Sequence, residues 1–123
     1  QRKGTHDYYN EKGLETAIKL DPENTNAYFG LANWYFYVPG IFGGNKTRAY
    51  QMIEKAIKMH PNYTAAILGK AEFLIQDQKT ADAIKVLNSV LRVKMPLYRG
   101  DGVIDKWKAK KLLEMLNRTG SFI

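Results

Sequence analysis

The apolar and polar positions along the chain follow the period of an α-helix. After Pro22 the apolar residues come at offsets of three, four and seven, which places them on one helical face: Tyr28, Leu31, Ala32 and Tyr35. The next stretch repeats this spacing at Ala49, Ile53 and Ala56, with small residues where a neighbouring helix can approach closely. No segment shows the period of two that a half-buried strand requires. The pattern therefore predicts an all-α protein.

Three prolines divide the helical pattern into units of similar length. Pro61 comes 39 residues after Pro22, and Pro96 comes 35 residues after Pro61. Proline cannot continue a helix and disfavours helical geometry in the residue before it, so each proline closes one unit. Both intervals are close to the roughly 34-residue period of helix–turn–helix repeats. We therefore expect about six helices in antiparallel pairs, arranged as an α–α superhelix.

These units are expected to form a single domain of residues 1–123. Residues 7–24 supply only the second helix of a partial repeat, whose partner helix we expect to precede the first residue. Residues 25–63 form a repeat with a long inter-helix turn. Residues 64–96 form a weaker repeat, and residues 97–123 form a loop and a C-terminal capping helix.

The last segment carries most of the positive charge. The chain has a formal net charge of +7, and residues 92–123 hold eight basic and three acidic residues. We expect a loop over 98–102 and a helix from Val103 to Leu116. Its apolar face is expected at Ile104, Trp107, Leu112, Leu113 and Leu116. The lysines are interpreted as its solvated face because Trp107 falls on the apolar side. Binding of nucleic acid or an anionic membrane surface through Lys106, Lys108, Lys110 and Lys111 is the alternative.

The repeat units resemble the tetratricopeptide repeat family. Counted from Thr25, the family's first-helix positions are occupied by Tyr28, Leu31, Ala32 and Tyr35, and its second-helix positions, after a five-residue insertion, by Ala49, Ile53, Ala56 and Pro61. The unit from Thr64 agrees at Ala71, Leu74, Ala83 and Leu87, but Lys70 stands where Leu is usual and Val90 replaces Ala. The resemblance implies a superhelix in which the first helix of each pair lines a concave face.

Transferred to this sequence, the resemblance implies a partner-binding groove rich in aromatic and amide side chains. Its positions are Asn26, Phe29, Asn33, Phe36 and Tyr37 in one repeat, and Ala65, Leu68, Glu72, Ile75 and Gln76 in the next. Exposed aromatic side chains offer large contact area at small entropy cost. We therefore expect a non-catalytic interaction or scaffold module that binds a protein or peptide. Burial of these residues under the terminal helix is the alternative. Because Phe29 stands where clamp-type members carry Lys, we expect no tight binding of acidic C-terminal tails.

The turn inside the first full repeat is long and apolar. It runs from Tyr37 to Lys46 and reads YVPGIFGGNK, and residues 28–42 hold seven of the chain's aromatic residues. One interpretation is a long turn whose glycines supply positive backbone angles and whose Asn45 caps the next helix. The other is a loop that walls a ligand cavity with Ile41 and Phe42.

The second interpretation rests on a narrower resemblance. The Pro and Gly-Gly-Asn turn, together with Lys106, Ala109, Leu112 and Leu113 in the last helix, is similar to the repeat proteins that accompany TRAP transporters, their T components. This resemblance implies an exported, membrane-anchored bacterial lipoprotein that engages a substrate-binding subunit and holds an apolar small molecule. It favours the periplasm over the cytoplasm.

Groups suited to catalysis are few. The chain has no cysteine, and its two histidines, His6 and His60, cannot form a metal-binding trio. Asp101 and Asp105 are expected to cap the last helix. Residues 40–47 nearly match a phosphate-binding loop but lack the strand that such a loop follows. We therefore expect no enzyme activity, cofactor or metal, and no membrane-spanning segment.

Overall fold

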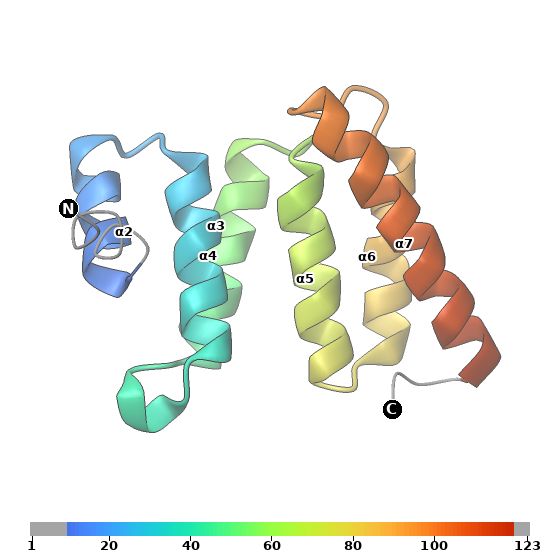
Figure 1. The fold of residues 1–123 in the computed structure, drawn as a ribbon, viewed down its shortest axis with the longest axis horizontal. Coiled ribbons are helices and arrows are strands. Elements are labelled where there is room, and N and C mark those ends of the chain that lie inside the picture. The colour runs from blue at the N-terminus through green and yellow to red at the C-terminus, as the bar shows by residue number, and fades with distance from the viewer. Residues whose placement is uncertain (1–9, 120–123) are drawn as a thin grey trace. The chain divides into compact units, whose positions relative to one another are not determined.

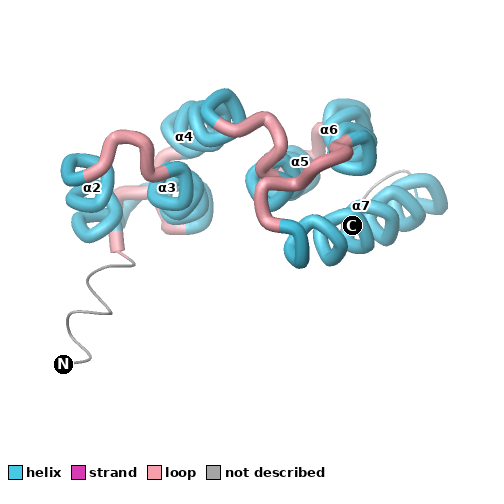
Figure 2. Tube along the Cα trace, turned by 90° about the horizontal axis from the view of Figure 1, so that it is seen from above, coloured by secondary structure: helices cyan, strands magenta, loops and turns pink. Residues whose placement is uncertain are grey.

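The computed structural model describes residues 10–119, which form helices joined by short connections (Figure 1). This part of the chain contains six α-helices and one short 3-10 helix, and Figure 2 shows helices and loops only. The expected all-α class, built from helix pairs, is confirmed. The helices group into two compact units, one ending at Met59 and the other starting at His60.

The first unit consists of α2 (Glu11–Leu20), α3 (Thr25–Tyr37) and α4 (Lys46–Met59). The side-chain oxygen of Asn10 accepts a hydrogen bond from the Gly13 amide at 2.9 Å and caps α2. Residues 7–9 of the expected helix lie outside the described residues. α3 packs against both α2 and α4 (Figure 1). The expected apolar positions form the core here, since all but the half-buried Tyr28 are buried: Leu31, Ala32, Tyr35, Ala49, Ile53 and Ala56.

The second unit consists of α5 (Thr64–Gln76), α6 (Thr80–Arg92) and α7 (Arg99–Thr119). Each of these helices contacts the other two. The largest fully buried side chains of the unit are Phe73, Leu87, Leu116 and Val90. The connection before α7 is tied to the start of α5, because Asn62 donates a side-chain hydrogen bond to the Met95 carbonyl at 2.9 Å. The unit therefore has a core of its own.

The last helix begins four residues earlier than expected, at Arg99 rather than Val103. The two glycines of residues 98–102 suggested a loop, but the Gly102 amide donates to the Tyr98 carbonyl at 2.8 Å as part of the first turn. A Cβ atom on Gly102 would lie 2.4 and 2.5 Å from ring carbons of Pro96. Gly102 is therefore needed for close packing of α7 on Pro96 rather than for chain reversal.

The buried face of α7 also differs from the expected one. Gly102, Asp105, Ala109 and Leu116 are buried, whereas Ile104 and Trp107 are 53% and 60% exposed. Leu112 and Leu113, also expected on this face, are half-buried. Small residues on the inner side let α7 lie close to α5 and α6, and this leaves large apolar side chains on the outer side.

Asp105 does not cap α7. It lies in the second turn, where its Oδ2 atom accepts a hydrogen bond from the Thr64 hydroxyl at 2.8 Å. Both side chains are buried, so this bond connects the start of α5 to α7 within the core of the second unit. Asp101 lies in the first turn of α7, where an acidic residue favours the helix dipole.

Candidate partner-binding surface

One face of α3 presents a row of aromatic and amide side chains. The row consists of Asn26, Phe29, Asn33 and Tyr37, which recur at steps of three and four residues. Asn26 is exposed, Phe29 and Asn33 are half-buried, and Tyr37 is 56% exposed. α3 contains no charged residue. The row is therefore an uncharged surface that combines ring faces with amide donors and acceptors.

Phe36, expected to face a partner, is buried. Its ring packs edge-to-face against Tyr37 and Tyr50, with centroids 5.0 and 6.1 Å away, and the Lys46 ammonium lies 4.9 Å from its centroid. Tyr50 and Lys46 belong to α4, so the contact that buries Phe36 is tertiary and has no signature in the spacing along α3. Phe36 therefore supports the Tyr37 ring from behind.

On α5 the expected groove positions are divided between core and surface. Leu68 and Ile75 are buried, which corrects their expected role as contact residues. α7 packs against α5. This contact agrees with the alternative expectation that the terminal helix covers residues of the groove. Glu72 and Gln76 are exposed, and Ala65 is half-buried. Neighbouring residues exclude part of the water around the Glu72 carboxyl and so raise its pKa, although the Lys108 ammonium on α7 lowers it.

The turn between α3 and α4 is closed by main-chain hydrogen bonds. It contains the 3-10 helix η1 (Gly40–Phe42). The Phe42 and Gly44 amides both donate to the Pro39 carbonyl, at 2.9 and 3.1 Å, and the Asn45 amide donates to the Tyr35 carbonyl at 2.8 Å. The Asn45 side chain accepts from the Arg48 amide at 3.0 Å, so the expected cap of α4 is confirmed.

Ile41 and Phe42 project from the tip of this turn. They are 85% and 72% exposed. The hollow beside the turn, of about 250 Å³, is lined by residues 35–40 and 44–46 and does not include them. The expectation that these two side chains close a cavity is therefore not met at this hollow.

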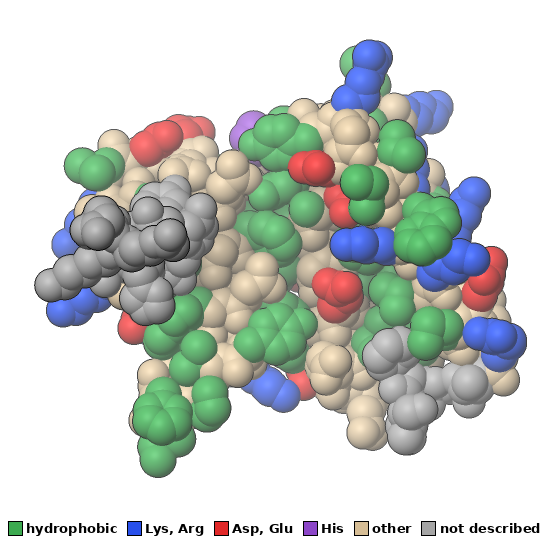
Figure 3. Space-filling view, in the orientation of Figure 1, with side chains coloured by type: hydrophobic (Ala, Val, Ile, Leu, Met, Phe, Trp, Pro, Cys, Tyr) green, Lys and Arg blue, Asp and Glu red, His purple; other side chains and the backbone are tan. Residues whose placement is uncertain are grey.

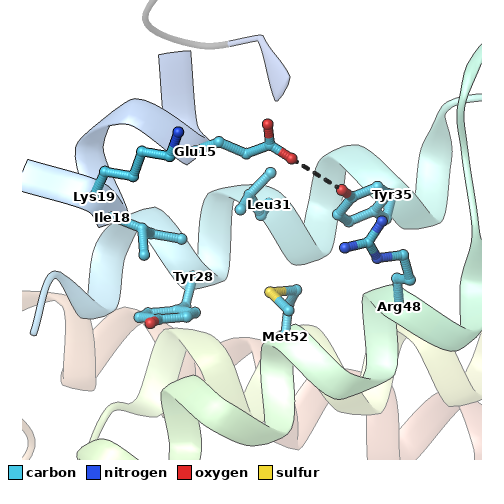
Figure 4. Close-up of a pocket in the computed structure, with 8 residues that line it drawn as sticks. All are labelled: Glu15, Ile18, Lys19, Tyr28, Leu31, Tyr35, Arg48 and Met52. Carbon is cyan, nitrogen blue, oxygen red and sulfur yellow. Dashed lines mark hydrogen bonds between the residues drawn. The ribbon is translucent and has the colours of Figure 1, made fainter. Parts of the chain in front are cut away.

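A pocket of about 260 Å³ lies over α3, between α2 and α4 (Figure 4). Ile18, Leu31 and Met52 give it apolar walls, and Glu15, Lys19, Tyr28, Tyr35 and Arg48 complete the lining. The Tyr35 hydroxyl donates to Glu11 at 2.8 Å and to Glu15 at 3.4 Å. The Arg48 guanidinium carbon lies 5.0 Å from the Tyr35 ring centroid. Sequence reasoning missed this pocket because it depends on the gap between two helices that are distant along the chain.

Burial and these carboxylates together fix the charge state of Tyr35. Burial raises the pKa of the Tyr35 hydroxyl to about 12, and its hydrogen bond to Glu11 adds to the increase. The hydroxyl is therefore a hydrogen-bond donor at neutral pH. It binds both carboxylates of α2, of which Glu15 lines the pocket.

The outer side of α7 combines apolar and basic residues. Val103, Ile104 and Trp107 are exposed, and the Lys111 ammonium lies 5.6 Å from the Trp107 ring centroid. The lysines were interpreted as a purely solvated face because Trp107 was expected on the buried, apolar side of the helix. Trp107 is exposed, so this reason no longer holds. An aromatic ring next to lysines suits both stacking and membrane contact.

Groups that could bind a metal do not cluster in the described part of the chain. Within residues 10–119 no three or more His, Cys, Asp or Glu side chains gather as a metal site would require. His60 is half-buried beside Pro61, and His6 lies outside the described residues. No helix in this part of the chain is both long enough and apolar enough to cross a membrane.

The comparison with protein families supports the repeat assignment over part of the chain. Residues 44–95 match the model of the tetratricopeptide repeat family, a span that covers α4, α5 and α6. Repeats of this family generally mediate protein–protein interaction and are typically non-catalytic. No curated protein matches the chain.

Proposed function

We propose that the protein is a non-catalytic interaction module that binds a peptide or protein segment along α3. The observation that carries this proposal is the row formed by Asn26, Phe29, Asn33 and Tyr37. The Tyr37 ring is mostly exposed, yet it is held from behind by the buried Phe36. A ring that is already fixed loses little conformational freedom on binding, which is the property of an interface anchor.

The chemistry of the row indicates what kind of segment it binds. The Asn26 and Asn33 amides can each donate to a peptide carbonyl and accept from a peptide amide. Phe29 and Tyr37 provide apolar contact area beside them. α3 has no charged residue with which to select an acidic or basic tail. The proposed partner is therefore an uncharged segment with exposed backbone groups and at least one apolar side chain.

Selection from a random-peptide display library, followed by titration of the selected peptides, tests this proposal. Tyr37→Ala should weaken their binding about tenfold or more, the size expected for an aromatic anchor. Tyr98→Ala, which removes an exposed tyrosine from the second unit, is the matched control. Selected peptides that bind the Tyr37→Ala protein as tightly as the parent would contradict the assignment of the surface.

The pocket between α2 and α4 favours a second candidate function, the binding of an apolar small molecule. Its volume of about 260 Å³ and its walls of Ile18, Leu31 and Met52 suit a small apolar ligand. This location differs from the loop at Ile41 and Phe42 to which the sequence pointed. Native mass spectrometry of protein purified from cells should show an added small-molecule mass that Met52→Trp removes. A parent protein that never shows such a mass speaks against this function.

The T-component resemblance remains a prediction, as do export and periplasmic location. It rests on the turn at Gly43–Asn45 and on the Lys106–Leu113 pattern of α7. Purified protein should then bind the substrate-binding subunit of a TRAP transporter in a size-exclusion experiment. Separate elution of the two proteins at micromolar concentration would contradict this prediction.

The exposed Trp107 and its lysines support a third candidate, nucleic-acid binding by α7. Binding of this type is electrostatic and weakens steeply with salt. A gel shift at low salt that disappears at physiological salt is the expected result. The absence of any shift at low salt excludes this role for α7.

A further inference from the structure

The turn between α3 and α4 is well ordered, yet it exposes two large apolar side chains to solvent. Figure 1 shows it extending beyond the ends of both helices, and Figure 3 shows hydrophobic side chains at its tip. Ile41 and Phe42 are 85% and 72% exposed there. A turn whose only task was to connect two helices would have polar residues at such positions.

The shape of the turn depends on its glycines. Gly43 has a φ of 107°, in the left-handed region, and a Cβ atom on it would lie 3.0 Å from the Trp34 ring. A Cβ atom on Gly44 would overlap the Val38 carbonyl. The backbone therefore fits closely against α3, and together with the hydrogen bonds to Pro39 this holds the tip in one conformation.

The charged residues that flank the turn in the sequence are basic. From residue 24 to residue 53 the chain contains no Asp or Glu, whereas Lys46 and Arg48 follow the turn directly. Within the first unit the carboxylates of Glu11 and Glu15 on α2 are engaged by the Tyr35 hydroxyl. Tyr37, an amphipathic ring of the kind that favours the water–lipid boundary, is exposed at the base of the turn.

We propose that this turn inserts Ile41 and Phe42 into the surface of an anionic lipid bilayer, with Lys46 and Arg48 at the level of the headgroups. A convex tip with two apolar side chains suits a fluid apolar phase, and the neighbouring cations complement anionic lipid. The contact is peripheral. It is carried by Ile41 and Phe42 and shares only Tyr37 with the α3 row, so it does not depend on the peptide-binding function proposed above.

Vesicle co-sedimentation of the full chain tests this proposal. The protein should bind vesicles that mix phosphatidylglycerol with phosphatidylcholine and should bind phosphatidylcholine alone more weakly. Phe42→Ser should lower the partition coefficient about tenfold, the effect of removing one large side chain from an apolar phase. Phe42→Leu should retain most of the binding. Because Phe42 is exposed, both variants should keep the parental circular dichroism and melting temperature.

Leu20→Ser is the matched control, since Leu20 is a large apolar residue of the same unit and is 83% exposed. It should leave the partition coefficient unchanged. The proposal is wrong if the parent protein does not bind anionic vesicles, or if Phe42→Ser binds them as well as the parent. It is also wrong if Leu20→Ser loses as much binding as Phe42→Ser, because the effect would then be nonspecific. Unchanged binding by Phe42→Ser would indicate that the tip docks into a pocket of another protein and not into a bilayer.

Trp34 provides an independent readout at the site. It lies against Gly43, and Trp107→Phe leaves it as the chain's sole tryptophan. Its fluorescence should shift to the blue on addition of anionic vesicles, and brominated lipid should quench it. An unshifted and unquenched spectrum under conditions of full sedimentation would place the membrane contact elsewhere, for example on the outer side of α7, and would overturn the proposal.

Discussion

Two buried tyrosines show how single residues tie the stability of this protein to pH. Tyr35 lies in the core of the first unit and Tyr63 in that of the second. Burial is the main cause that raises the pKa of each hydroxyl to about 12, and nearby carboxylates contribute to both increases. In the unfolded chain a tyrosine ionises near its ordinary value of about 10. The folded protein therefore holds these two protons more tightly than the unfolded chain does.

The sign of the effect follows from this difference. The stabilisation is fully present below about pH 10 and is lost as the pH rises toward about 12, because the unfolded chain releases the protons first. Urea denaturation at increasing pH should show a falling free energy of unfolding across this range. Tyr63→Phe should make the decline less steep, because it removes one of the two protons that the folded protein holds more tightly. Equal slopes for the parent protein and Tyr63→Phe would contradict the prediction.

Residue-scale reasoning from the sequence identified part of the candidate surface. Asn26 and Tyr37 are exposed as the repeat resemblance implied, and Phe29 and Asn33 are partly so. Phe36 is buried instead, by Tyr50 and Lys46 of α4. Such contacts come from a neighbouring helix, and the spacing along a single helix carries no information about them.

At the scale of the element, α7 shows where helical periodicity is informative and where it fails. The pattern correctly predicted a helix after Pro96. The predicted face was right at Leu116, which is buried, but wrong in the first half of the helix. There the buried positions hold Gly102, Asp105 and Ala109, whereas the bulkier Ile104 and Trp107 are exposed. A prediction from hydrophobicity alone assigns large apolar residues to the buried face of a helix. Close packing of a helix against two others instead selects small ones.

Gly102 and Gly100 in the first turn of α7 allow a matched test of this packing. Gly102→Ala should destabilise the protein by about 1–3 kcal/mol, because its methyl group would overlap the Pro96 ring. Gly100→Ala meets nothing within 4 Å and should be neutral, or stabilising by up to about 1 kcal/mol through helix propensity. Thermal or urea denaturation of both variants measures the difference. Equal stability of the two variants would show that α7 does not rest on Pro96 in solution.

At the scale of the whole molecule, the chain consists of two compact units that meet in the sequence between Met59 and His60. The repeat pattern of the sequence predicted a boundary between the two fuller repeats close to this point, after residue 63. The regular spacing of the prolines allowed this boundary to be predicted from the sequence. The pocket between α2 and α4 was not visible, since it arises from the spacing of helices in space and has no motif of its own.

The second unit should fold without the first. Residues 60–123 contain three mutually packed helices with Phe73, Leu87 and Leu116 in their core. The core of so small a unit supplies at most about 3–5 kcal/mol of net stability, which is enough for cooperative folding. The isolated segment should therefore show a helical circular dichroism spectrum and a cooperative thermal transition. A broad, non-cooperative transition would mean that this unit requires the preceding helices.

The main-chain hydrogen bonds of the turn between α3 and α4 have a consequence for how the protein can change. The conformation of the turn is set by Pro39, Gly43, Gly44 and Asn45, and the side chains at its tip take no part in the bonds that close it. Ile41 and Phe42 can therefore be exchanged without refolding the turn. Substitutions at these two positions should therefore change the chemistry that the turn exposes to a binding partner while its backbone stays the same.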